Sequence, residues 1–306
     1  MPGAGRIVWD LSKANLADRI YVFSLVVVTP WLLVSPRVEN RWWLAGINIA
    51  CLLVIRALQL GAKRSRAGQF LHDWYPLGMF IVCFEEVSRL SFLVREGWQD
   101  HYILAIEARW FPLPPTVWLG QHGSWLLTEL LELGYFSYFV LLMIVGGVLY
   151  ARVPKRPFRQ VMDATVLAYL VCYVVFIFFP TEGPAHTLAA QHTFPLPGGG
   201  PFHWIVGLIQ SNAGVHGNAF PSAHVAGGVV SLFFAWKYAP KLGFALTPLV
   251  VLLCVGAVYD RYHYVLDVVA GILVGVAASL IIAKGWLGAS NRSVRDSRVS
   301  YAKPVN

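Results

Sequence analysis

The segment YVLDVVAGILVGVAASLIIAKG, residues 264–285, contains one carboxylate and one lysine in an otherwise apolar run. A helix of about 20 mainly apolar residues is long enough to cross the hydrocarbon core of a bilayer. The segment therefore predicts a transmembrane helix. Its carboxylate, Asp267, lies at the helix start and close to His263. Ionisable residues at such positions are candidates for function, because charge inside a membrane is costly.

The composition of the whole chain agrees with a membrane protein. The 306 residues are 57% hydrophobic and only 13% charged, and the mean hydropathy is +0.58. These values are typical of polytopic membrane proteins and not of soluble globules. We therefore predict an all-α fold with about eight transmembrane helices. The expected spans are 20–35, 42–60, 74–94, 125–150, 162–180, 219–238, 243–260 and 264–285.

Lysine and arginine alternate along this series of spans. They gather near both termini and in alternate loops, for example 63–66 and 152–159, whereas the intervening loops contain few. Because cytoplasmic loops are enriched in these residues, both termini are expected in the cytoplasm. The net charge of +8 then reflects topology and attraction to anionic lipids, and no nucleic-acid partner is expected.

One membrane domain is the simplest organisation. We divide it into N-terminal helices with an interfacial segment (1–124), a catalytic helical core (125–287) and a cytoplasmic tail (288–306). The first helix is interpreted as an uncleaved anchor. The cysteines all lie within predicted spans and form neither a disulfide framework nor a CxxC pair. The sequence does not indicate an oligomeric state.

Histidines gather on the side opposite to the basic loops. The segment 181–218 has no Lys or Arg, and His224 follows at the start of the next span, within GNAFPSAHVAGG (217–228). The four histidines of the segment are His186, His192, His203 and His216. Their spacing matches no compact ligand motif, so no metal site is expected.

His224, His263 and Asp267 form the candidate catalytic group. Residues four apart on a helix share a face, so Asp267 is expected to bond one ring nitrogen of His263 at about 2.6–3.2 Å. The other nitrogen would remain available for chemistry. Alternatively, Asp267 caps a helix and His224 faces water after a helix start capped by Ser222. The occurrence of both histidines at helix starts on one side favours function.

These motifs resemble those of a known family. FPSAH (220–224) and HYVLD (263–267) resemble the second and third motifs of the type 2 phosphatidic acid phosphatase superfamily. The form RYHYVLD (261–267) is similar to its branch of inositol phosphorylceramide and sphingomyelin synthases. The resemblance covers the last four helices. It implies a metal-independent transfer without a cofactor, with His263 as the nucleophile that forms a phosphohistidine, Asp267 as its orienting carboxylate and His224 as the general acid.

The chain departs from the phosphatase pattern in its phosphate-binding residues. The arginine expected six residues before the nucleophile is replaced by Ala257, and Arg261 lies two residues before it. Lys155-Arg156-Pro157 imitates the end of the first motif, but it lies on the cytoplasmic side, about 28 Å away along a helix. Arg261, Ser222 and His186 are therefore the candidate substrate-binding residues.

Arg261 is the only guanidinium among these three residues, and a phosphomonoester dianion would need more positive charge. A phosphodiester substrate is therefore favoured. The expected reaction moves a phospho-headgroup from a phospholipid to a lipid hydroxyl at the extracytoplasmic face. Hydrolysis of phosphatidic acid or a polyprenyl phosphate is the alternative. A transporter is the alternative of another class, because Glu85, Glu86 and Arg89 fall within the third span. If these residues instead have a structural role, we expect an ion pair between helices.

Overall fold

The computed structural model describes residues 14–36, 38, 40–213 and 216–285. All regular elements in these residues are helices, which confirms the predicted all-α class. The long helices are α1 (Leu16–Val34), α2 (Arg41–Ala62), α3 (Arg66–Ser88), α6 (Trp125–Tyr150), α7 (Arg156–Phe178), α10 (Ala223–Tyr238), α11 (Pro240–Tyr259) and α12 (Val265–Ala283). The short ones are α4 (Asp100–Glu107), α5 (Pro115–Gln121), α8 (Pro184–Thr187), the 3₁₀ turn η1 (Ala189–Gln191) and α9 (Pro201–Ala213).

Each long helix falls on one of the predicted spans. Within the described ranges, six helices are long and apolar enough to cross a membrane, namely α1, α2, α6, α7, α11 and α12. Helix α10 has only 16 residues, and α3 is interrupted by ionisable side chains such as Asp73 and Glu86. The membrane character is thus confirmed, whereas the count of eight spans stays a prediction. The expected tail, 288–306, lies outside the described residues.

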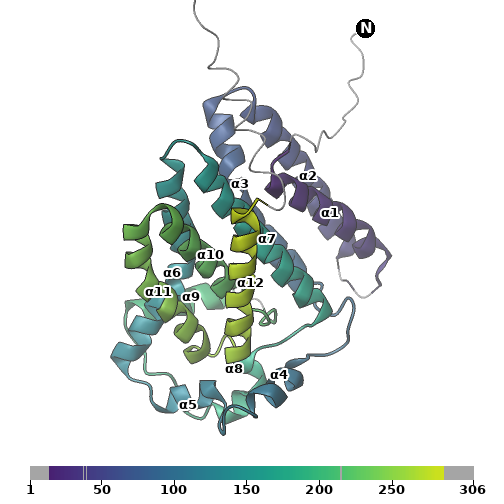
Figure 1. Cartoon of the computed structure of the whole chain (residues 1–306). Coiled ribbons are helices and arrows are strands. Elements are labelled where there is room, and N and C mark those ends of the chain that lie inside the picture. The colour runs from purple at the N-terminus through teal and green to yellow at the C-terminus, as the bar shows by residue number, and fades with distance from the viewer. Residues whose placement is uncertain (1–13, 37, 39, 214–215, 286–306) are drawn as a thin grey trace, which may run out of the picture.

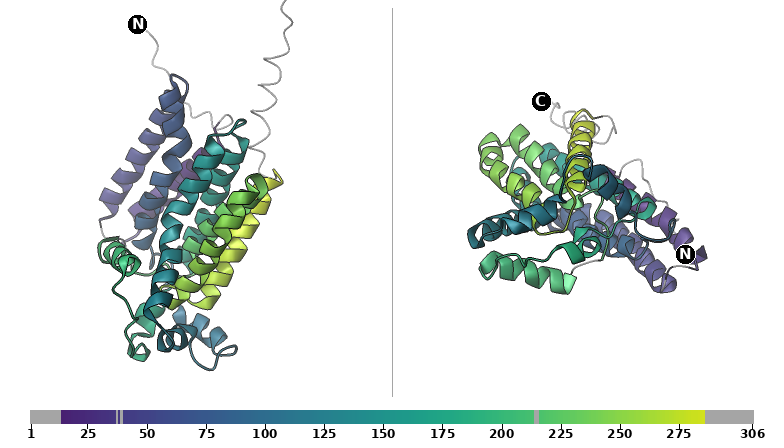
Figure 2. Two further views of the ribbon diagram at one scale, coloured as in Figure 1. Left: turned by 90° about the vertical axis from the view of Figure 1, so that its left-hand side faces the viewer. Right: turned by 90° about the horizontal axis from the view of Figure 1, so that it is seen from below.

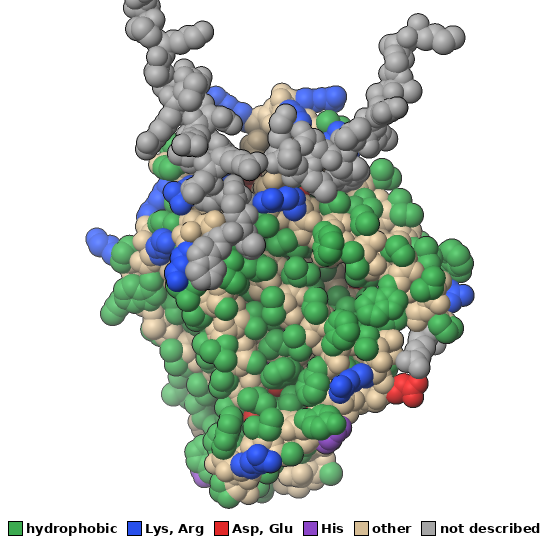
Figure 3. Space-filling model, turned by 45° about the vertical axis from the view of Figure 1, so that its right-hand side comes forward, with side chains coloured by type: hydrophobic (Ala, Val, Ile, Leu, Met, Phe, Trp, Pro, Cys, Tyr) green, Lys and Arg blue, Asp and Glu red, His purple; other side chains and the backbone are tan. Residues whose placement is uncertain are grey.

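Large apolar side chains cover the sides of the bundle. Phe23, Trp42 and Phe244, which come from three different helices, are each about 70% exposed. Figure 3 shows apolar side chains over most of one face, with Lys and Arg gathered above them. Apolar surface of this extent is stable only against lipid or another apolar partner. The exposed apolar surface therefore supports insertion in a membrane.

Polar contacts identify which helix ends meet at one end of the bundle. The Asp18 carboxylate of α1 accepts hydrogen bonds from Gln59 of α2 at 2.9 Å and from the ring Nε2 of His72 of α3 at 3.1 Å. Gln160, near the start of α7, donates to the Ile282 carbonyl near the end of α12. The basic segments 63–66 and 152–159 adjoin these same helix ends. The short helices α4, α5 and α8 lie at the opposite end (Figure 1).

Glu86 of α3 is used in contact between helices. Its buried carboxylate accepts a hydrogen bond of 2.7 Å from the Asn48 amide of α2. No ion pair joins Glu85 to Arg89 within the part of the chain that the structure describes. The ion-pair interpretation is therefore wrong: Glu86 is bonded to an amide, and both Glu85 and Arg89 are exposed.

Helices α10 and α12 approach each other closely along two glycines. A Cβ atom on Gly271 would lie 2.5 Å from the Ser222 carbonyl oxygen, and one on Gly275 would lie 2.7 Å from the Ala226 carbonyl oxygen. At the end of this contact the Ser222 amide donates to the Asp267 carbonyl at 3.0 Å. Small residues allow such backbone contact between membrane helices. The two helices run side by side with α11 (Figure 2).

The Gly275→Ala variant should test this contact. Its new methyl group would press on a backbone oxygen that cannot move independently of α10, so we expect a loss of about 1–3 kcal/mol of stability. The measurement is the thermal unfolding midpoint in detergent. Gly147→Ala is the control, because no atom lies within 4 Å of its Cβ position and alanine favours helix. Equal midpoints for the two variants would contradict the close approach of α10 and α12.

Candidate active site

The turn between α11 and α12 presents His263 to the protein interior. The Ala257 carbonyl accepts hydrogen bonds from the amides of Tyr262 and His263, and Arg261 takes a left-handed conformation with φ of 66°. His263 is buried, and its ring Nδ1 lies 2.9 Å from the Ala219 carbonyl oxygen. Because a carbonyl can only accept, Nδ1 carries the proton and Nε2 holds the lone pair.

Asp267 has a different contact from the one expected. Its Oδ2 atom accepts a hydrogen bond of 2.8 Å from the Tyr264 amide, which caps the start of α12. The same oxygen lies 3.4 Å from His263 Nδ1, outside the expected range of 2.6–3.2 Å. That expectation is wrong in its geometry, since the unpaired amides at the helix start bind the carboxylate. The Ala219 carbonyl orients the imidazole.

His224 is the second residue of α10, and three rings surround it. The Ser222 side chain accepts from the Val225 amide at 3.3 Å and caps the helix, as in the alternative interpretation of the sequence. His224 Nε2 lies 3.4 Å from the hydroxyl of Tyr135, and the Tyr138 ring lies 4.5 Å away, centroid to centroid. His224 Nδ1 is buried and has no partner in the described part of the chain.

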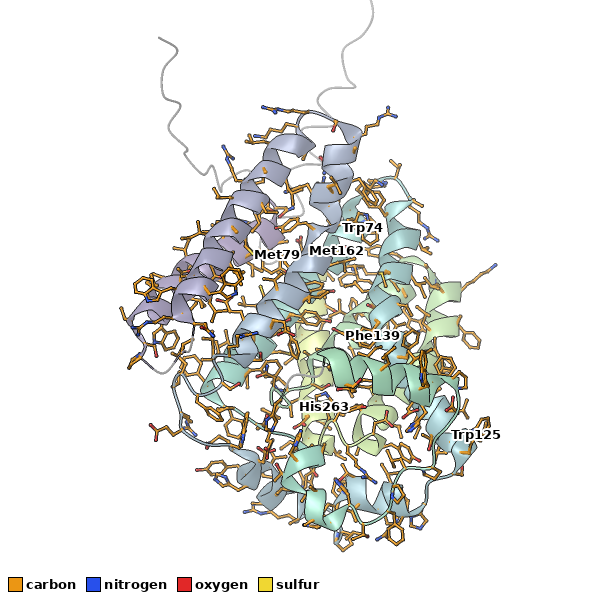
Figure 4. The ribbon with its side chains drawn as sticks, turned by 180° about the vertical axis from the view of Figure 1, so that it is seen from behind. Trp74, Met79, Trp125, Phe139, Met162 and His263 are labelled. Carbon is orange, nitrogen blue, oxygen red and sulfur yellow. The ribbon has the colours of Figure 1, made fainter. Side chains whose placement is uncertain are left out.

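The third ring beside His224 is that of His263. The two ring centroids are 5.7 Å apart, and the ring planes are inclined at 60°. Figure 4 places His263 inside the lower half of the bundle, whereas Trp74 and Met162 mark the upper half. The structure thus brings together two histidines that belong to separate sequence motifs.

Burial changes the proton affinity of His263. Removal of the ring from water lowers the pKa of His263 to about 4, although the hydrogen bond to the Ala219 carbonyl acts in the opposite direction. Desolvation disfavours the charged imidazolium. His263 is therefore neutral at physiological pH, with an unprotonated nitrogen.

The three candidate substrate-binding residues lie in different surroundings. The Arg261 guanidinium donates to the Phe194 carbonyl in the segment 181–218, and its Nε is buried without a partner in the described residues. Ser222 is fully buried as the cap of α10. The His186 ring lies 4.3 Å from the His216 ring, centroid to centroid. In the described ranges, no hydrogen bond, ion pair or ring contact joins Arg261 or His186 to His224 or His263.

Lys155-Arg156-Pro157 lies at the other end of the bundle. Lys155 immediately precedes α7 and bonds to the Tyr150 carbonyl. The opposite end of α7 leads to Thr181, whose hydroxyl accepts from the Phe220 amide at 2.8 Å. Lys155-Arg156-Pro157 is thus separated from the two histidines by the length of α7, as predicted. The segment after α7 fixes the backbone beside Ala219.

Residues 101–281 match the family model described as PAP2 superfamily. This chain belongs to the PAP2 superfamily. Members are phosphatases or phosphotransferases that act on membrane lipids. A PA-phosphatase related-family protein of Dictyostelium discoideum is 24% identical over 171 residues, which are 49% of this chain and 31% of that protein. The chain therefore spans about a third of that relative's length. No solved structure matches.

The PAP2 match begins at α4, earlier in the chain than the motifs recognised in the sequence. Two carboxylates of α4 form hydrogen bonds with residues next to His263. Asp100 accepts hydrogen bonds from the Tyr264 hydroxyl at 2.9 Å and from the amides of Glu182 and Gly183 at 2.8 Å. Glu107 accepts from the Leu266 amide at 2.9 Å. Sequence reasoning missed both carboxylates, because no local spacing links them to residues 264–266.

Nitrogen-15 NMR of histidine-labelled protein should report the state of His263. We expect a neutral ring with the proton on Nδ1 that titrates near pH 4, because burial lowers the pKa. Between about pH 6.5 and 4 the unfolded chain takes up a proton that the folded chain does not, so this residue lowers folding stability as the pH falls through that window. His263→Ala assigns the signal. A proton on Nε2, or titration above pH 6, would contradict the geometry.

Proposed function

We propose that this protein is a lipid phosphotransferase that works through a phosphohistidine on His263. One observation carries the proposal. A buried, neutral His263 has its Nδ1 on a backbone carbonyl and its ring 5.7 Å from that of His224. Such an imidazole is a nucleophile at neutral pH, and a second imidazole beside it can move a proton. Membership of the PAP2 superfamily supports the same chemistry.

The first step transfers the phosphoryl group to the protein. The Nε2 lone pair of His263 attacks phosphorus and forms an N–P bond, while the bond from phosphorus to the leaving alkoxide breaks. His224 gives its proton to that oxygen, so the leaving group departs as an alcohol. The anionic phosphate beside the ring stabilises the imidazolium that this role requires. Asp267 caps α12 and adds negative charge 3.4 Å from Nδ1 of His263.

The second step releases the phosphoryl group. A hydroxyl attacks phosphorus, His224 takes its proton, and the N–P bond breaks to regenerate neutral His263. A lipid hydroxyl gives headgroup transfer, and water gives hydrolysis. His263 is buried and His224 is partly buried, so a lipid headgroup reaches His263 when neighbouring side chains move aside. Tyr138 and Tyr135, whose ring centroids lie 4.5 and 5.3 Å from that of His224, are the side chains we propose to move.

The limited positive charge supports transfer of a diester headgroup. Arg261 uses a donor on the Phe194 carbonyl and retains a buried Nε without a partner in the described residues, so it has donors for a phosphate oxygen. The start of α10 after Ser222 adds backbone amides that favour an anion. The role of His186 at the phosphate stays a prediction. RYHYVLD is similar to the inositol phosphorylceramide synthase form, and headgroup transfer of that kind is the function we favour.

Hydrolysis is the second candidate function. It is favoured by the match to a protein named as PA-phosphatase related. We also propose that the end of the bundle with the basic segments faces the cytoplasm, which puts His224 and His263 on the extracytoplasmic side. The transporter alternative rested on the ionisable residues of α3. The hydrogen bond between Glu86 and Asn48 gives one of these residues a structural role instead.

Four substitutions should separate the proposed roles. His263→Ala should give no covalent intermediate, measured by alkali-quenched labelling with a phosphorus-labelled donor. His224→Ala should lower turnover by about 10²–10⁴-fold, with partial recovery on a p-nitrophenyl phosphodiester, whose leaving group needs no proton. Asp267→Asn should cost less, because its side-chain oxygen still caps Tyr264 and Ala219 still orients the ring. Arg261→Lys should mainly raise KM, because lysine lacks the bidentate fork.

His122→Ala is the matched control. This exposed histidine bonds through Nδ1 to the Trp118 carbonyl one helical turn away, so its loss should leave labelling and turnover unchanged. All variants should retain the wild-type unfolding profile in detergent. Labelling that persists in a folded His263→Ala protein would overturn the mechanism.

Product analysis should separate transfer from hydrolysis. Purified protein is incubated with labelled phosphatidylinositol, with and without ceramide or diacylglycerol, and with labelled phosphatidic acid alone. We expect a labelled lipid product only when a hydroxyl acceptor is present, and the same rate after chelator treatment because the two histidines perform both proton and phosphoryl transfer. Phosphate release from phosphatidic acid without an acceptor would favour the phosphatase. Loss on chelation that zinc or magnesium restores, without a change in the unfolding profile, would contradict metal independence.

A further inference from the structure

A second group of ionisable side chains lies on the outer surface. His216 Nε2 is 2.8 Å from the Glu182 carboxylate, and the ring of His186 lies against that of His216. The available ligand atoms of the three side chains all lie within 4.8 Å of one another. We expected no metal site among the outer histidines because of their spacing in the sequence. The fold, however, brings two of them together with a glutamate.

These three side chains suit a zinc ion. Imidazole nitrogens and carboxylate oxygens bind Zn²⁺ at about 2.0–2.2 Å, and three protein ligands leave a fourth position for water. In a tetrahedron of that size, neighbouring ligand atoms are roughly 3.3–3.6 Å apart. The observed spacing therefore requires only small side-chain rotations. Both histidines are exposed and the glutamate is half-buried, so an ion can enter from solution.

Neighbouring residues contact the group on two sides. The amide of Glu182 donates to Asp100 at 2.8 Å, and His186 follows four residues later in α8. On the other side, the ring of Trp98 lies 5.4 Å from that of His216, centroid to centroid. A group that such contacts already position loses less conformational entropy when it binds an ion.

We propose that Glu182, His186 and His216 form a zinc site on the outer face. Two ligands come from the beginning of the segment 181–218 and one from its end, so the ion closes this long loop. Its place is distinct from the reacting histidines, of which His263 is buried and His224 is partly buried. Ala219, three residues after His216, carries the carbonyl that orients His263. Zinc therefore stabilises the surface next to the site without taking part in phosphoryl transfer.

Zinc binding to the full-length protein tests the proposal. The protein is purified without a polyhistidine tag, treated with chelator, exchanged into chelator-free detergent buffer and titrated with zinc chloride against a chromogenic zinc indicator. We expect one zinc ion per chain and an unfolding midpoint that rises with zinc concentration, because an ion that binds only the folded state stabilises it. His186→Ala, His216→Ala and Glu182→Gln should each weaken binding at least tenfold.

Two controls make the result specific. His203→Ala removes an outer histidine that bonds to Glu132 instead, and His263→Ala removes the proposed nucleophile; both should bind zinc as the wild type does. The zinc-free ligand variants should unfold at the same temperature as zinc-free wild type, so that lost binding is not lost folding. The proposal is overturned if wild type binds no zinc, if the ligand variants bind normally, or if His263→Ala abolishes binding. The last result would place the ion at the reaction centre.

Discussion

The close approach of α10 and α12 is the contact on which the site depends. Gly271 and Gly275 let the backbone of α12 touch the carbonyls of Ser222 and Ala226. This contact sets the start of α10 beside the start of α12, where the Ser222 amide donates to the Asp267 carbonyl. His224 on one helix and the His263 turn before the other are then held with ring centroids 5.7 Å apart. Larger residues at either glycine would separate the two rings.

Hydrogen bonds to backbone amides organise the end of the bundle that carries His224 and His263. Asp267 caps the Tyr264 amide and Glu107 caps that of Leu266, so two carboxylates bind the first turn of α12. Asp100 connects the Tyr264 hydroxyl to the amides after α7. Unpaired amides in a region of low polarity are costly. The hydrogen bonds of these three carboxylates remove this cost. They also hold the turn that carries His263 and the loop that carries Glu182.

The position of the two histidines could be predicted, but the contact that orients them could not. FPSAH and HYVLD each put a histidine at the start of an apolar helix, which local patterns reveal. The partner of His263 is the backbone carbonyl of Ala219. Every residue has a backbone carbonyl, so the residue type does not show which one will bond the ring. Asp267 was expected to bond the ring because it lies four residues on, yet helix-start amides competed for the carboxylate. Tyr135, beside His224, belongs to α6 and had no motif to indicate it.

The sequence by itself determined the helical class, the positions of the long helices and the gathering of histidines at one end, because hydrophobic length and charge alternation are local properties. Only the tertiary structure decided which of those histidines meet. It paired His224 with His263, and His186 with His216 and Glu182. Arg261 was instead directed toward the Phe194 carbonyl. Such contacts depend on how helices distant in sequence pack, and packing is set by glycine contacts and buried hydrogen bonds that no single segment contains.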